Sequence, residues 1–244
     1  MYAKIINMNR IEDIYENMAN KPSKEDKAWI KKAYDFAEKA HDGQKRASGE
    51  PYFNHVFEVS KILADFGMDT KTIIAGLLHD TIEDTKVTEE DLDEAFGEDV
   101  LFLVNGVSKL GKVKYRGEER HVESLRKFFV AMAEDARVII IKLADCLHNM
   151  RTLEHVPPEK QERIARETLE IYAPIANRLG IGEIKGELED LCFKYLDPEH
   201  YRETTELEET YLHQGQAYME KTIALFRDVL TKQKIRVTDI SGRT

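Results

Sequence analysis

Three separated segments of the chain contain side chains of the kinds that bind divalent metal ions. His55 stands alone, His79 and Asp80 are adjacent, and Asp145 interrupts the most hydrophobic stretch. Two imidazoles and two carboxylates form a mixed nitrogen and oxygen set that suits Mn, Fe or Zn, and its oxygen share favours Mn. Each residue alone has a more common structural explanation, because buried polar groups usually pair with each other. The order H…HD…D on successive predicted helices therefore predicts one metal site, which no single residue of the set would predict alone.

A second pair of carboxylates follows in the segment HDTIED. Glu83 comes four residues after His79, and Asp84 four residues after Asp80, so on a continuing helical turn they would stack near these ligands. A carboxylate there can orient a water molecule and accept its proton, while a metal lowers that water's pKa. A solvated acidic turn would contain the same residues. Spacing alone favours neither interpretation.

The helix expected around the last of the four ligands would present Lys142, Asn149 and Thr152 on the same face. Asn149 and Thr152 offer neutral hydrogen bonds to a polar or phosphorylated ligand, and Lys142 offers a positive charge. Snorkelling from a buried helix is the alternative for Lys142. We expect no ligand role for His148 or His155, because the four-residue set is already complete.

Two basic segments could attract an anionic substrate. The first is the loop Lys45-Arg46-Ala47-Ser48-Gly49, directly before the helix of His55, and the second contains Lys109, Lys112, Lys114, Arg116 and Arg120. Arginine can clasp a phosphate through two hydrogen bonds or stack on a base. Basic loops are more often solvated surface, and this alternative stays open for the second segment. The sequence has no Gly-rich phosphate loop of the Walker type.

The overall composition excludes some classes of function. The 244 residues carry a formal net charge of -10, which does not suit non-specific binding to nucleic acid or anionic lipid. The sequence has no signal pattern at its N-terminus and no apolar run of the ~20 residues needed to span a bilayer. Its two cysteines, Cys146 and Cys192, favour reduced buried thiols over a disulfide. We therefore expect a soluble, cytoplasmic protein.

Helical periodicity dominates the chain and predicts an all-α fold. Capping boxes are expected at Ser23 and Thr88, and Thr70 is expected to cap the helix that runs into His79. Further helices are expected over about residues 98–110, 121–134, 183–195 and 199–233, and from Pro157 towards Leu179 with a kink at Pro174. Only Ile235 to Ile240 has the pattern of a strand.

The pattern also carries a resemblance to a known family. Over most of residues 30–201 the chain contains, in order, AHDGQKRASGEPYFNH, AGLLHDTIEDT, VSKLGKVKYRGEE, KLADCLHNMRTL, YAPIANRLGI and LEDLCFKYLDPEHY. These segments resemble the hydrolase domain of the bifunctional (p)ppGpp synthetase/hydrolases, the long RelA/SpoT homologues of bacteria. The resemblance implies an all-helical HD bundle that holds a Mn²⁺ ion through His55, His79, Asp80 and Asp145.

The resemblance also implies the reaction and its residues. The 3′-pyrophosphate of ppGpp or pppGpp would be removed, which releases GDP or GTP and pyrophosphate. Glu83 and Asp84 would position or activate the attacking water. The nucleotide would be held by Lys45 and Arg46 around the guanine base and by Ser48, Asn149 and Thr152.

The same resemblance predicts the domain organisation and the partners. We expect the hydrolase domain over residues 1–196, a helical linker region over 197–234 and the start of a truncated synthetase domain over 235–244. The expected partners are (p)ppGpp and, in a full-length protein, the synthetase and regulatory domains, with no direct nucleic acid or membrane partner. Two residues depart from the family: Cys146 replaces a usual Arg, and Gly186 a usual Trp. Neither is a predicted ligand, so we expect catalysis to survive.

Two other functions stay open. The chain could be an HD phosphohydrolase that acts on another nucleotide such as NADPH, as small relatives of the family do. It could also be a non-catalytic module that binds (p)ppGpp and regulates a synthetase. The complete HDTIED segment favours an enzyme, because a retired site has no need of both carboxylates.

Overall fold

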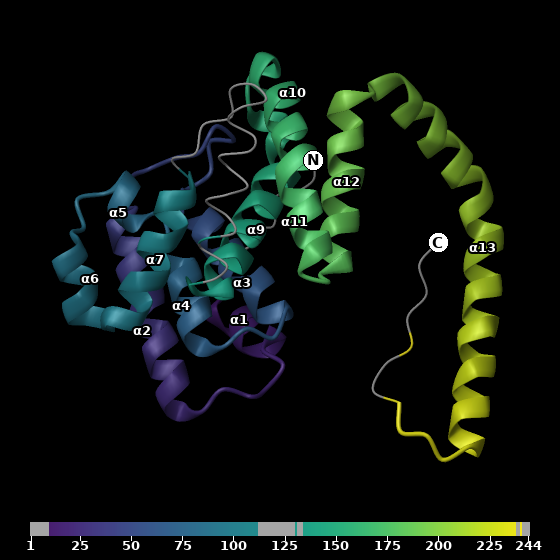
Figure 1. The fold of residues 1–244 in the computed structure, drawn as a ribbon, viewed down its shortest axis with the longest axis horizontal. Helices are drawn as coiled ribbons and strands as arrows, with labels where there is room; N and C mark the ends of the chain where they lie inside the picture. Colours follow the sequence, from purple (N-terminus) through teal and green to yellow (C-terminus); the bar gives the residue numbers. More distant parts are fainter. Residues whose placement is uncertain (1–9, 112–129, 131–133, 238–239, 241–244) are drawn as a thin grey trace, which may run out of the picture. The chain divides into compact units, whose positions relative to one another are not determined.

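The computed structural model describes residues 10–111, 130, 134–237 and 240 (Figure 1). The described residues form helices and loops, with one isolated β-bridge between Lys45 and Pro51, so the predicted all-α fold is confirmed. The chain divides into two compact units, residues 1–192 and residues 193–244. Among the described helices, none is long and apolar enough to cross a membrane.

The helices follow one another in this order: α1 (Ile11–Asn17), α2 (Lys24–Ala40), α3 (Phe53–Asp65), α4 (Thr70–Leu78), α5 (Thr81–Asp84), α6 (Glu89–Phe96), α7 (Glu98–Gly111), α9 (Ala136–Arg151), the 3₁₀ turn η1 (Leu153–His155), α10 (Pro158–Glu167), the π-helical segment η2 (Thr168–Tyr172), α11 (Ala173–Arg178), α12 (Gly182–Leu196) and α13 (Pro198–Lys232). The long α13 belongs to the second unit.

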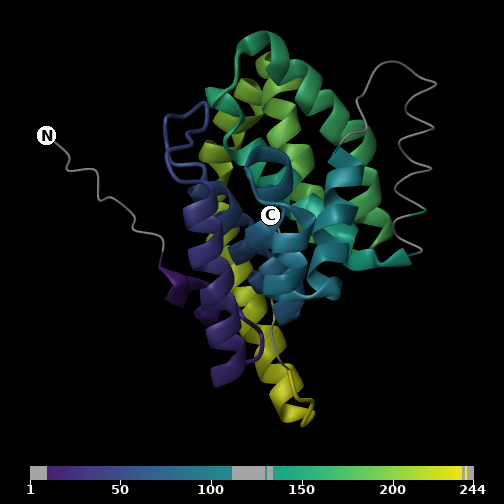
Figure 2. The same cartoon turned by 90° about the vertical axis from the view of Figure 1, so that its left-hand side faces the viewer.

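The core of the first unit lies between α3, α4, α7 and α9. Helix α3 packs against α4 and α9, and α7 contacts both α4 and α9. Large apolar side chains on these helices are fully buried, among them Phe57, Leu63, Ile73, Leu78 and Ile139. Burial of such a side chain stabilises the fold by about 1.5–3 kcal/mol. Apolar contact therefore holds together α3, α4 and α9, the helices on or beside which the predicted metal ligands lie. The loop that follows α2 lies at one end of α2 and α3 (Figure 2).

Short-range signals in the sequence predict most helix starts correctly. The capping boxes expected at α2 and α6 are both formed. The prediction that Thr70 caps α4 is wrong, because the side chain of Asp69 accepts the backbone N–H of Thr72 and Thr70 is already helical. A carboxylate is a good cap at this position, since its charge also favours the positive end of the helix dipole.

The helix expected from Pro157 towards Leu179 is interrupted where the sequence predicts a kink. Its middle is the π-helical segment η2, and the N–H of Ala173 bonds to the carbonyl of Thr168, five residues earlier. The next residue, Pro174, has no N–H to donate, so the regular ladder cannot continue through it. The interruption therefore takes the form of a π-bulge, one of the usual causes of a change in helix direction.

Four sequence predictions concern the remaining parts of the chain. The strand expected over residues 235–240 is wrong for its described residues, which adopt no regular structure. A lone strand is not stable without a neighbour that accepts its hydrogen bonds, and the described chain offers none. Most of the helix expected over 121–134, and the second basic segment beyond Lys109, lie outside the described residues. The domain boundaries at 196 and 234 stay predictions.

Both cysteines are free and buried, as the composition predicts. The Sγ atom of Cys146 lies 3.6 Å from Oγ1 of Thr168, and the thiol of Cys192 donates to the carbonyl of Ala165 at 3.2 Å. Burial raises the pKa of each thiol to about 12. Since the thiolate is the reactive form, neither cysteine is a nucleophile at neutral pH. In this chain Cys146 packs α9 against η2.

The close approach of α7 to α9 generates a prediction. A Cβ atom on Gly106 would lie 2.7 and 2.9 Å from the two γ-carbons of Val138, and the stiff χ1 of valine prevents both from moving away. We expect Gly106→Ala to lower the free energy of unfolding by about 1–2 kcal/mol, because overpacking outweighs the better helix propensity of alanine. Urea titration of the variant measures this difference.

Gly182→Ala is the matched control, because a Cβ there meets no atom within 4 Å. Its free energy of unfolding should be unchanged or slightly higher. Equal behaviour of the two variants would contradict the steric account of the α7–α9 contact.

Candidate metal centre and nucleotide pocket

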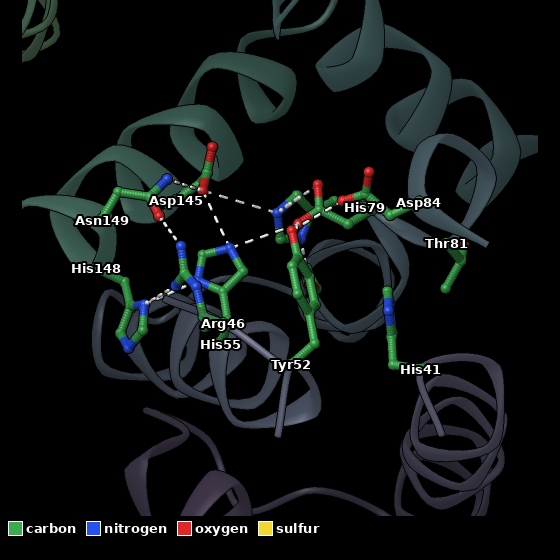
Figure 3. Close-up of polar contacts among 12 residues, drawn as sticks. His41, Arg46, Tyr52, His55, His79, Thr81, Asp84, Asp145, His148 and Asn149 are labelled. Atoms are coloured by element: carbon green, nitrogen blue, oxygen red, sulfur yellow. Dashed lines mark hydrogen bonds and ion pairs between the residues drawn. The ribbon is translucent and has the colours of Figure 1, made fainter. Parts of the chain in front are cut away.

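The four predicted metal ligands lie together at the meeting point of α3, α4 and α9. One donor atom each from His55, His79 and Asp80 falls within 4.8 Å of the others. Oδ1 of Asp145 lies 3.2 Å from Nε2 of His55 and 3.8 Å from Nε2 of His79. Both imidazoles and the Asp145 carboxylate are buried, and the three side chains point toward one another (Figure 3). Residues separated by up to 90 positions in the sequence therefore face one small volume.

The local backbone explains how neighbouring residues can face the same point. Helix α4 ends at Leu78, and His79 is its C-cap. Thr81 donates its hydroxyl to the carbonyl of Leu78 at 2.6 Å, and the short α5 begins there. The helical turn considered for HDTIED is thus not continuous with α4. The N–H of Asp84 still bonds to the carbonyl of Asp80, so the expected four-residue stacking of these two carboxylates is formed.

His79 provides the test of whether these side chains fit a metal ion. Its Nδ1 lies 2.8 Å from the carbonyl oxygen of Gly76, which can only accept, so Nδ1 carries a proton. Its Nε2 is buried without a hydrogen-bond partner among the described groups, although Oδ1 of Asp80 lies 3.2 Å away. A histidine ligand of a metal commonly shows this arrangement, with one nitrogen donating to the backbone and the other free. The donor set fits a divalent ion.

Electrostatics at His79 support the same conclusion. Burial alone lowers the pKa of this imidazole, but the carboxylates of Asp80 and Asp145 outweigh it and raise the pKa to about 10. Burial alone would raise the pKa of Asp145, yet Lys142, His55 and His79 hold it well below its usual range. Two ionised carboxylates thus concentrate negative potential in a buried volume, which attracts a positive charge.

Both oxygens of Asp145 are engaged by side chains of its own helix. Lys142 donates to Oδ2 at 2.7 Å, and the amide of Asn149 donates to Oδ1 at 2.7 Å. Lys142 is largely buried, with 16% of its side chain exposed, so it is not a simple snorkelling lysine. Its ammonium orients Asp145 and also lines the pocket described below.

Tyr52 connects the predicted metal ligands to the second carboxylate pair. Its hydroxyl lies 2.7 Å from Oδ2 of Asp80 and 2.9 Å from Oδ2 of Asp84, and can donate to either (Figure 3). Burial and the two carboxylates raise the pKa of Tyr52 far above its usual value, so the hydroxyl keeps its proton. Glu83, one residue before Asp84, is exposed. Nothing in the sequence distinguishes Tyr52 from a core residue, because an aromatic residue at a helix start is usually buried for packing.

A cavity of about 520 Å³ opens beside Asp145. Its lining includes all six residues predicted to bind substrate, namely Lys45, Arg46, Ser48, Lys142, Asn149 and Thr152. The loop that carries the first three folds back on itself, since the N–H of Arg46 bonds to the carbonyl of Glu50 and Gly49 turns with φ of 84°. Lys109 is exposed and is not part of this lining.

Arg46 and His148 link the pocket to the predicted metal ligands. The guanidinium of Arg46 bonds to Oδ1 of Asn149 and lies 3.2 Å from Nδ1 of His148. That same Nδ1 lies 2.8 Å from Nδ1 of His55. Burial, His55 and Arg46 lower the pKa of His148 to about 3, so this imidazole is neutral. The sequence predicted no ligand role for His148, and this stays a prediction, but its contact with a metal ligand was not foreseen.

Comparison with known proteins places this arrangement in a family. The sequence pattern of the HD domain matches residues 33–182, more than half of the chain. The chain belongs to the HD-domain family. It is 50% identical over 218 residues to a GTP pyrophosphokinase of Myxococcus xanthus, with 88% of this chain and 29% of that protein covered.

Other relatives of this HD-domain chain have names that refer to hydrolysis. It is 51% identical to a guanosine-3′,5′-bis(diphosphate) 3′-pyrophosphohydrolase of Aquifex aeolicus, with 78% of this chain and 27% of that protein covered. It is 54% identical to the bifunctional (p)ppGpp synthase/hydrolase SpoT of Escherichia coli, with 71% and 25% covered. The chain thus spans less than a third of the length of these relatives, and the resemblance to the RelA/SpoT homologues is confirmed.

A solved structure shares the fold. It is described as a metazoan orthologue of SpoT that hydrolyses ppGpp and plays a role in starvation responses. The TM-score is 0.54 at 28% identity, with 72% of this chain and 97% of that chain covered. The helical HD bundle is therefore common to both proteins.

The metal centre generates a prediction that needs no substrate. We expect the chain, stripped of metal by EDTA, to bind one Mn²⁺ per molecule. His79→Ala should weaken this binding by more than about 100-fold, because loss of a ligand costs more affinity than loss of a hydrogen bond to a ligand. Isothermal titration calorimetry measures both. His155→Ala is the control, because its imidazole is half exposed and faces Glu154 instead. Equal affinities of the two variants would refute the assignment of His79.

Proposed function

We propose that this chain hydrolyses (p)ppGpp at its 3′-pyrophosphate and releases GDP or GTP and pyrophosphate. The observation that carries the proposal is a buried His/Asp cluster beside a cavity with a basic loop. Such a cavity suits an anionic nucleotide, even though the chain as a whole has a net charge of -10. The hydrolase names of relatives at about 50% identity support the same substrate.

The metal we propose is Mn²⁺, held by His55, His79, Asp80 and Asp145. Two carboxylates among four ligands support a harder ion than a thiolate-rich site would. Bound there, a divalent cation lowers the pKa of a water molecule and stabilises negative charge on a phosphoryl oxygen. The protein fixes the orientation of these ligands through hydrogen bonds. The carbonyl of Gly76 accepts from Nδ1 of His79, and Lys142 and Asn149 donate to Asp145.

Asp84 and Glu83 are the groups we propose for positioning the attacking water and accepting its proton. Asp84 is held close to Asp80 by their shared contact with the hydroxyl of Tyr52. Because Tyr52 keeps its own proton, it can orient these carboxylates without competing as a base. Asp84 and Glu83 are exposed, so a proton accepted there passes directly to solvent.

The nucleotide would occupy the cavity beside Asp145. Lys45 and Arg46 would hold the guanine base, with Arg46 already placed over the ring of Tyr52 at 5.7 Å from its centroid. Ser48, Asn149 and Thr152 would donate or accept neutral hydrogen bonds. Lys142 would contribute its charge to the cavity wall while it stays paired with Asp145.

The biological setting is part of the same proposal. A protein that degrades (p)ppGpp would act in the cytoplasm of a bacterium, where this nucleotide regulates the stringent response. In a longer protein the hydrolase would be joined to synthetase and regulatory domains, as the name of the bifunctional relative suggests. We expect no direct partner among nucleic acids or membranes, given the acidic composition.

The direct test is an assay of the purified chain with Mn²⁺ and ppGpp. We expect equimolar GDP and pyrophosphate, abolished by EDTA and restored by Mn²⁺, with separation of nucleotides by anion-exchange chromatography as the measurement. NADPH at the same concentration should not be hydrolysed. Tight ppGpp binding without metal-dependent turnover would instead favour a non-catalytic module, and hydrolysis of NADPH alone would identify a different HD phosphohydrolase.

The water-positioning role predicts a specific kinetic defect. Glu83→Gln or Asp84→Asn should lower kcat by about 100-fold or more, because a general base contributes factors of this size. The Mn²⁺ content should be unchanged, since neither side chain is a proposed ligand. Glu89→Gln, an exposed acid at the start of α6, is the control and should retain full activity. Loss of Mn²⁺ from either site variant would make that residue a ligand.

A further inference from the structure

The structure assigns to His148 a positioning role: it accepts a hydrogen bond from His55 and fixes the ring nitrogen that His55 presents to the metal. This inference rests on the metal site of the proposed function but not on the identity of the substrate. His148 lies on α9, three residues after Asp145. One helix would thus supply both a metal ligand and the group that orients a second ligand from α3.

The direction of the hydrogen bonds follows from Arg46. A guanidinium has only donors, and Nη1 of Arg46 lies 3.2 Å from Nδ1 of His148. That nitrogen must therefore present its lone pair. Nδ1 of His55 lies 2.8 Å from the same atom, so His55 carries the proton of this shorter contact, and the two donors share the single lone pair of His148 Nδ1. The neutral His148 then has its own proton on Nε2.

The consequence for His55 is a fixed tautomer. With its proton on Nδ1, its Nε2 has a lone pair, and this atom lies 3.2 Å from Oδ1 of Asp145 and 3.5 Å from Oδ2 of Asp80. Three electron-rich atoms at these distances repel one another unless a cation lies among them. The Arg46–His148–His55 chain therefore prepares His55 as a ligand, as backbone carbonyls do for many metal-binding histidines.

The contact also sets His148 apart from an ordinary packing residue. Its ring lies 4.9 Å from the ring of His55, centroid to centroid, in a tilted arrangement in which the two Nδ1 atoms meet (Figure 3). His79 uses the carbonyl of Gly76 for the same purpose. The two histidine ligands are thus oriented by different kinds of acceptor, one from the backbone and one from a side chain that can be substituted.

Substitutions that differ only in the acceptor test this role. The side-chain oxygen of asparagine can occupy the place of Nδ1, whereas leucine has similar size and no acceptor. In titrations of the EDTA-treated chain with Mn²⁺, we expect His148→Leu to bind about 10–100-fold more weakly than the unsubstituted chain, and His148→Asn to recover most of that loss. Thermal unfolding of the metal-free variants, followed by circular dichroism, separates this effect from a general loss of stability.

The tautomers can be observed directly. In the full chain labelled with ¹⁵N-histidine and loaded with diamagnetic Zn²⁺, long-range ¹H–¹⁵N spectra should show His148 protonated on Nε2 and His55 on Nδ1. His148 protonated on Nδ1, or equal Mn²⁺ affinities of the leucine variant and the unsubstituted chain, would overturn the inference. If the unsubstituted chain binds no Mn²⁺, the proposed metal site fails and this role fails with it. Failure of ppGpp hydrolysis with Mn²⁺ binding intact would overturn only the substrate.

Discussion

Two carboxylates face two buried imidazoles at the centre of this protein, and the rest of the structure has to keep that charge in place. Asp80 and Asp145 lie within 3.2–3.8 Å of the Nε2 atoms of His55 and His79, away from bulk water. Such a cluster is costly without a cation. Apolar contacts between α3, α4 and α9 hold it together. Lys142 and Asn149 donate to the two oxygens of Asp145, and Tyr52 donates to Asp80. The packing and hydrogen bonds of the fold thus hold together a charge cluster that a cation would stabilise.

The sequence alone predicts that four possible metal ligands lie together, because the prediction depends on residue type and helical spacing, and the structure brings their side chains together. His55, His79, Asp80 and Asp145 each have a common structural explanation alone, and their order along the chain identifies them together. The all-α fold and most helix starts follow from periodicity and capping residues. The residues predicted to bind substrate come partly from helical spacing and partly from the family resemblance, and all of them line one cavity.

Contacts between distant segments are what the sequence does not reveal. Tyr52 and His148 have the residue types of a core aromatic and a spare histidine, and only the packing of α3 against α9 brings His148 to His55. The break after Leu78 was also not foreseen, since hydrogen bonds of Thr81 and Asp84 decide it and not periodicity. The strand expected near the C-terminus shows that a favourable local pattern is not sufficient, because a strand forms no sheet without a partner.

The glycine at position 106 has a consequence for how such a centre can change over evolution. It lets α7 approach Val138 near the start of α9, and α9 continues from there to Asp145, about two turns further along. The close packing of α7 on α9, the helix of Asp145, therefore depends on the absence of a side chain at Gly106. Exchange of small apolar residues at this helix crossing could therefore shift α9, and Asp145 with it, while every predicted ligand stays the same.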